Sequence, residues 1–181
     1  MKNFFIIMLC AIVTLCIIWP FSDKIAYHFL SNNSELIPKE AKEKKELLFY
    51  KYSSNHTFED GYRVKLNQSE NLDIKQLVAK SFKNSPDILL DYFGVKDLSE
   101  NEIVQKILNY EKINFFKVID YNENEVLLGE KGDEFFYLSY SVHTINNEKY
   151  FEVRSSTNYW YISIIKPFHV YIMMGFLKFL S

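Results

Sequence analysis

The chain has 181 residues, of which 48% are hydrophobic and 17% aromatic, and its formal net charge is −2. This length suits one domain with an appendage and is too short for two full catalytic domains. The near-neutral charge gives no reason to expect nucleic acid as a partner, and the low glycine and proline content excludes collagen-like and Gly/Pro-rich disordered chains.

Residues 1–22 have the pattern of a membrane anchor. A short basic start with Lys2 precedes an apolar run from Phe4 to Trp19, in which Thr14 is the only polar residue. Such a run is typical of an uncleaved anchor or a cleaved signal peptide, and a buried soluble helix is the remaining alternative. Because no small-residue cleavage site follows, we expect an uncleaved single-pass anchor in the cell membrane. The positive-inside rule then places the domain outside the cytoplasm.

Residues 23–56 are expected to link the anchor to a domain that spans residues 57–181. Within this linker, residues 39–52 read as a short charged helix, which either docks on the domain through its apolar end or remains a solvated spacer. Both cysteines, Cys10 and Cys16, lie in the apolar N-terminal run. The domain therefore has no disulfide framework and depends on its own core.

The domain begins with an edge strand near residues 60–66, and three helical segments follow. Residues 72–82 carry apolar side chains at helical spacing. Ser85 is the expected N-cap of a second helix that ends at Gly94. Ser99 opens a third helix with a capping box.

From residue 114 onward, apolar residues recur at every second position and no longer at every third or fourth. This spacing predicts antiparallel strands. On the third of these strands, Phe136 and Tyr140 share an apolar face, while Ser139 and His143 share the opposite, more polar face. The four predicted strands are 114–121, 125–130, 134–144 and 148–156.

The C-terminal segment, residues 158–181, is apolar on every side. A second membrane span is one interpretation, but Lys166, Pro167 and His169 make its insertion marginal. We therefore favour a helix buried in the domain and kinked at Pro167.

Three segments carry a resemblance to a known family. They are the stretch from Tyr161 through Ile165-Lys166-Pro167-Phe168-His169 to Ile172, the hairpin that begins with Glu125–Glu130, and the helix junction Phe82-x-x-Ser85-Pro86. Together they resemble the bacterial domain of unknown function 2867 family, which is related to the START-like (SRPBCC) helix-grip superfamily. The resemblance implies an α+β fold in which an antiparallel sheet wraps a long C-terminal helix around an apolar cavity. The order of strand, helices, strands and apolar helix agrees with this architecture.

The candidate site residues fit binding better than catalysis. His169 lies in the motif beside the proline, and we interpret it as a core histidine because no nucleophile is visible near it in the sequence. Arg154 either points to the mouth of a cavity or, as we favour, forms a cross-strand ion pair with Glu152 or a neighbouring carboxylate. Asp120–Asn124 begins like a calcium loop, but Glu125 replaces the required glycine, so a hairpin turn is the better interpretation.

These observations lead to two functional hypotheses. The first is a membrane-tethered helix-grip domain that binds an apolar small molecule or lipid. The second is a non-catalytic structural or interaction domain that docks a membrane partner. No cofactor or metal ion is expected, and an enzyme is the least favoured class, since no catalytic motif is found. The residues predicted to line the cavity are Phe136, Tyr140, Arg154, Trp160, Phe168 and His169.

Overall fold

A computed structural model describes residues 34–36, 46–66, 72–114, 116–130, 136–159 and 166–177. The predicted anchor, residues 1–22, lies outside these ranges, as do Trp160 and the predicted turn at residues 131–133. Within the described ranges, no helix combines the length and apolar character needed to cross a bilayer.

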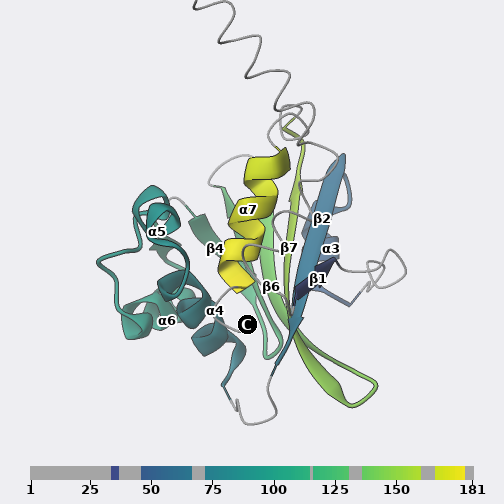
Figure 1. Cartoon of the computed structure of the whole chain (residues 1–181), viewed down its shortest axis with the longest axis horizontal. Coiled ribbons are helices and arrows are strands. Elements are labelled where there is room, and N and C mark those ends of the chain that lie inside the picture. Colours follow the sequence, from purple (N-terminus) through teal and green to yellow (C-terminus); the bar gives the residue numbers. More distant parts are fainter. Residues whose placement is uncertain are drawn as a thin grey trace, which may run out of the picture.

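The protein has an α+β fold built on one antiparallel sheet (Figure 1). The strands lie in the order β1-β2-β7-β6-β5-β4-β3, so that the first long strand, β2, pairs with the last, β7. Their bounds are β1 Ser34–Leu36, β2 Phe58–Lys65, β3 Lys112–Ile113, β4 Phe116–Tyr121, β5 Glu125–Glu130, β6 Phe136–Ile145 and β7 Glu148–Thr157.

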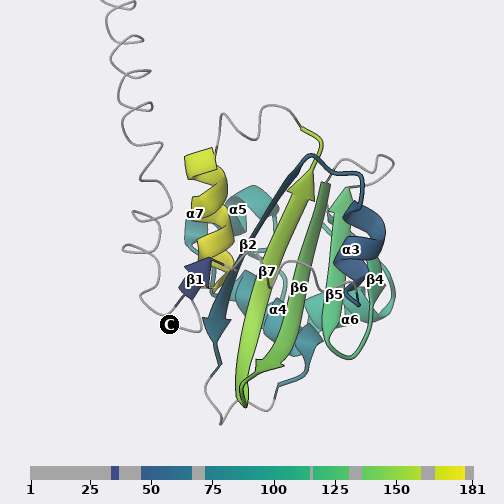
Figure 2. The ribbon, with the colours of Figure 1, turned by 90° about the vertical axis from the view of Figure 1, so that its right-hand side faces the viewer.

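The helices divide unequally between the two faces of the sheet (Figure 2). Four helices lie on one side, which we call the inner face, and the short helix α3 covers the opposite side, the outer face. The bounds are α3 Leu48–Ser53, α4 Ile74–Lys83, α5 Asp87–Phe93, α6 Glu100–Leu108 and α7 Lys166–Leu177.

Most of the predicted elements are confirmed, with small shifts at their ends. Asp73 and Ser99 both form capping boxes, and Gly94 ends α5 with a left-handed φ of 59°. The expectation for Ser85 is wrong, because Pro86 occupies the N-cap position of α5. The Ser85 hydroxyl instead donates to the carbonyl of Ser81, within the packed layer of helices.

The strand predictions also hold in outline, with two corrections. The strand expected over 114–121 begins later, at Phe116, because Asn114 has a φ of 56° and lies in the turn between β3 and β4. β2 is not an edge strand along its whole length, because Ser34–Leu36, which is predicted to belong to the linker, pairs with Tyr62–Val64.

The C-terminal segment forms a buried helix over residues 166–177, as predicted. Met173, Met174 and Phe176 are buried in the main core. The helix begins at Lys166, so Pro167 lies in its first turn, where proline is tolerated, and not at a kink inside the helix. At the other end, Ser81 Oγ donates to the carbonyl of Phe176 at 2.5 Å and so satisfies a carbonyl of the last turn.

Candidate functional site

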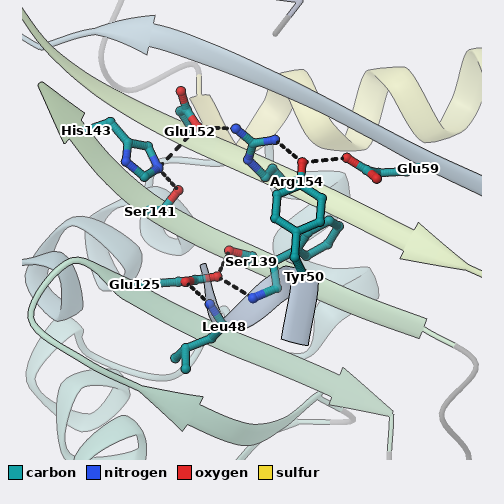
Figure 3. Close-up of polar contacts among 10 residues, drawn as sticks. Leu48, Tyr50, Glu59, Glu125, Ser139, Ser141, His143, Glu152 and Arg154 are labelled. Atoms are coloured by element: carbon teal, nitrogen blue, oxygen red, sulfur yellow. Dashed lines mark hydrogen bonds and ion pairs between the residues drawn. The ribbon is translucent and has the colours of Figure 1, made fainter. Parts of the chain in front are cut away.

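The outer face of the sheet carries a buried network of charged side chains beneath α3 (Figure 3). Period-two alternation places Glu152 and Arg154 of β7 on this face, together with Ser139, Ser141 and His143 of β6. Arg154 is fully buried, and its Nη2 lies 2.7 Å from Glu152 Oε2. The predicted ion pair is therefore present, but it joins residues i and i+2 of one strand and is not cross-strand.

Tyr50 links this ion pair to α3 and β2. Arg154 Nη1 donates to the Tyr50 hydroxyl at 2.8 Å, and that hydroxyl donates to Glu59 at 2.9 Å. Burial raises the pKa of Tyr50, and Glu59 adds to the rise, so the phenol keeps its proton. On the other side of the pair, His143 Nε2 lies 3.3 Å from Glu152 Oε2 and 2.9 Å from Ser141 Oγ.

Glu125 fixes the start of α3 to the sheet. α3 has no side-chain cap of its own at Leu47, but the carboxylate of Glu125 accepts from the backbone N–H groups of Leu48 at 2.6 Å and Phe49 at 2.9 Å. The Ser139 hydroxyl donates to the same carboxylate at 2.6 Å. Burial raises the pKa of Glu125, since its effect exceeds that of these three hydrogen bonds. A residue far along the chain thus acts as the helix cap.

A cavity of about 370 Å³ lies beside this network, between the start of α3 and the β4–β5 turn. Five of the eight residues that line it have oxygen-bearing side chains, and the turn itself is held by a hydrogen bond from Asn122 N–H to the carbonyl of Glu125. This turn is the segment that begins like a calcium loop, so the hairpin interpretation is confirmed. The lining residues are Glu46, Leu47, Asn122, Glu123, Asn124, Glu125, Val142 and His143.

A second buried polar group lies on the inner face, where β2 and β7 meet α7. Asp60 of β2 pairs in register with Ser155 of β7, and both side chains point toward His169 of α7. Asp60 Oδ1 lies 2.7 Å from Ser155 Oγ and 3.1 Å from His169 Nε2, and Ser155 Oγ lies 2.9 Å from the same nitrogen. Asp60 and His169 are only 7% and 6% exposed. The group fastens α7 to the first and last long strands.

These three residue types also make up the catalytic triad of serine hydrolases, but their geometry here differs. In a triad the histidine contacts serine with one ring nitrogen and aspartate with the other, so that it can take the serine proton while the aspartate orients it. Here both Ser155 and Asp60 contact Nε2. Ser155 is also fully buried. The arrangement suits a hydrogen-bonded junction and does not form a proton relay.

Aromatic rings lie beside this junction at the same end of the sheet. Thr157 pairs with Phe58 on one side and with Phe136 on the other, so the two half-buried rings flank it on the inner face. The ring of Phe58 meets that of His169 edge to face, with centroids 5.7 Å apart. We call Phe58, Asp60, Phe136, Ser155, Thr157 and His169 the inner-face site.

Only some of the predicted site residues come together. Phe136 and His169 belong to the inner-face site, and Tyr140 lies further along the inner face, fully buried among Phe82, Phe151 and Phe176. Arg154 lies on the outer face and is therefore separate from Phe136, Tyr140 and His169 on the inner face. Phe168 belongs to α7, one residue before His169, and Trp160 lies outside the described residues.

Asp60, Ser155 and Glu125 are not among the site residues predicted from the sequence. A signal for two of them is present: alternation in β2 places Asp60 on the same face as Tyr62 and Val64, and alternation in β7 places Ser155 with Val153. A polar residue on an apolar face is the informative exception. Among the described residues, no group of three or more metal-binding side chains is close enough to hold an ion.

Comparison with known proteins gives no relative: no family model, no curated protein and no solved structure matches the chain.

Proposed function

We propose that this chain is a membrane-tethered helix-grip domain that binds an apolar small molecule or lipid at the inner-face site. The tether is the predicted anchor of residues 1–22, which would hold the domain at the outer surface of the cell membrane. Membership of the domain of unknown function 2867 family and of the helix-grip superfamily is part of the same proposal. The antiparallel sheet, the pairing of β2 with β7 and the packing of α7 on the inner face support it.

One observation carries the binding proposal: a buried, unsatisfied carboxylate oxygen lies beside half-buried aromatic rings. Asp60 Oδ2 has no hydrogen-bond partner among the described residues, while Phe58 and Phe136 lie on the same face at the adjacent end of the sheet. Ligand sites in proteins combine apolar walls with a few placed polar groups. The inner-face site has this composition.

A second function is favoured by the packing further along the inner face. Tyr140 contacts Phe82 and Phe176, with ring centroids 5.8 Å and 5.6 Å apart, and Phe82 contacts Phe176 at 5.3 Å. These rings occupy the space between the middle of the sheet and α7. They favour a packed, non-catalytic interaction domain that docks a membrane partner.

Lipid extraction separates the two functions. The full-length chain is purified from cells, extracted with organic solvent, and analysed by mass spectrometry for co-purifying apolar molecules. The binding proposal expects a retained ligand, and expects the double variant Phe58→Ala/Phe136→Ala to retain several-fold less. Tyr110→Ala is the matched control, because Tyr110 is an aromatic residue that is 48% exposed and is not part of the inner-face site. Wild-type protein that retains no apolar molecule would contradict binding and favour the interaction domain.

A further inference from the structure

The two oxygens of the Asp60 carboxylate have unequal surroundings. Oδ1 lies within hydrogen-bond distance of both Ser155 Oγ and His169 Nε2, whereas Oδ2 is buried and has no partner among the described residues. Native proteins pair nearly all buried polar atoms, so an exception requires an explanation. An acceptor left without a donor is destabilising.

The neighbouring side chains do not supply the missing donor. The hydroxyl of Ser155 and the Nε2 atom of His169 are both directed at Oδ1, and at each other. The ring of Phe58, which packs edge-on against His169, has no polar hydrogen to give. None of the described residues supplies a donor to Oδ2, which leaves this acceptor available to a molecule that enters the site.

The surroundings indicate what else that molecule contains. Asp60 lies two residues along β2 from Phe58, on the same face, and Phe58 and Phe136 flank Thr157 in register. Both rings are half-buried and so present apolar surface next to the polar junction. An apolar body against the rings and a polar head at Asp60 satisfy both features.

We propose that the ligand of the inner-face site carries a hydrogen-bond-donating head, such as the hydroxyl of a long-chain alcohol or an acylglycerol, and that Asp60 Oδ2 accepts this hydrogen bond. An anionic head is disfavoured, since a second carboxylate or a phosphate beside Asp60 would add like-charge repulsion and supply no donor. This inference rests on the proposed function and names the ligand class of the same site.

Photo-crosslinking to the full-length chain in lipid nanodiscs tests the inference. Three ten-carbon diazirine probes differ only in the head group: an alcohol, its methyl ether and a carboxylate. Labelled peptides that contain Phe58 or His169 are quantified by mass spectrometry. Because hydrogen bonds to charged groups are among the stronger ones, we expect the alcohol to label these peptides about tenfold more than the other two probes.

Asp60→Asn is the decisive variant. The amide oxygen keeps the place of Oδ1, where two donors converge, and the NH2 group takes the place of Oδ2. A donor then replaces an acceptor, so the alcohol should lose its advantage while the ether and the carboxylate gain. Glu125→Gln is the matched control, since it makes the same change in a buried carboxylate on the outer face and should leave the order of the probes unchanged.

The outcomes separate the two proposals. If no probe labels these peptides in the wild-type protein, binding at the inner-face site is refuted. If all three probes label them equally and Asp60→Asn changes nothing, binding at the inner-face site is supported and the role of Asp60 is refuted. A water molecule would then be the donor to Oδ2.

Discussion

Two buried carboxylates on opposite faces of one sheet differ in how fully they are satisfied. Glu125, on the outer face, accepts three hydrogen bonds shared between its two oxygens, two of them from the backbone of α3. Asp60, on the inner face, accepts its bonds at Oδ1 alone. Both residues are at most 7% exposed, so solvent does not account for the difference.

The difference separates a structural polar group from a candidate binding group. On the outer face, Glu125 holds α3 to the sheet, and Arg154 connects Glu152 of its own strand, β7, to Tyr50 of α3. On the inner face, the hydrogen bonds among Asp60, Ser155 and His169 hold α7, but Asp60 Oδ2 has no donor among the described residues. Substitutions on the two faces should therefore change different properties, namely stability on the outer face and ligand choice on the inner face.

Arg154→Met should have the largest effect on stability. The substitution keeps most of the volume of the side chain but removes the cation that lies against the fully buried Glu152. Breaking a buried ion pair from one side typically costs about 3–5 kcal/mol, because the remaining charge stays buried. Urea denaturation followed by circular dichroism measures the loss.

The matched control for this substitution is Lys65→Met, on the neighbouring strand β2. Lys65 is exposed and forms an ion pair with the exposed Glu148, so its loss should cost much less than the loss of Arg154. Equal losses in the two variants would mean that the outer-face network does not hold the fold together.

Glu125→Gln should have an intermediate effect that depends on pH. The amide keeps one acceptor but turns an NH2 group toward the N–H of Leu48 or Phe49, which leaves a buried donor unsatisfied at a cost of about 1–3 kcal/mol. Burial raises the pKa of Glu125 in the folded protein. The stability that this group contributes is therefore fully present below the pH at which a free glutamate titrates, and is lost as the pH rises through the raised pKa.

The deficit of Glu125→Gln relative to wild type should accordingly be largest near pH 4 and narrow toward pH 7. Denaturation of both proteins across this range gives the difference at each pH. A deficit that widens with rising pH would show that the hydrogen bonds from α3 outweigh burial at this position.

The sequence predicts the elements of this fold better than its polar contacts. Period-two alternation located β5, β6 and β7 and assigned the two faces of β6 correctly, because one face of each strand is buried against apolar side chains. The Ser99 capping box was equally predictable, since both partners lie within one turn. Such patterns are local and need no knowledge of the rest of the chain.

The outer-face network depends on contacts between residues far apart in the chain. Glu125 caps a helix that begins 77 residues earlier, and Arg154 reaches Tyr50 across 104 residues. The sequence predicts a carboxylate partner for Arg154 but does not indicate Tyr50, because it leaves open whether α3 docks on the domain or remains a solvated spacer. Only the three-dimensional arrangement of the strands brings these groups together.

Asp60→Asn should have the smallest effect on stability, which sharpens the contrast between the two carboxylates. The amide oxygen still accepts from Ser155 and His169, and the position of Oδ2 has no protein donor to lose. Replacing an unpartnered oxygen by an NH2 group and removing a buried charge act in opposite directions, so we expect the free energy of unfolding to change by less than about 1 kcal/mol. Urea denaturation beside Glu125→Gln measures both variants under one condition. A loss for Asp60→Asn as large as that for Glu125→Gln would mean that Asp60, like Glu125, acts as a structural group that holds the fold.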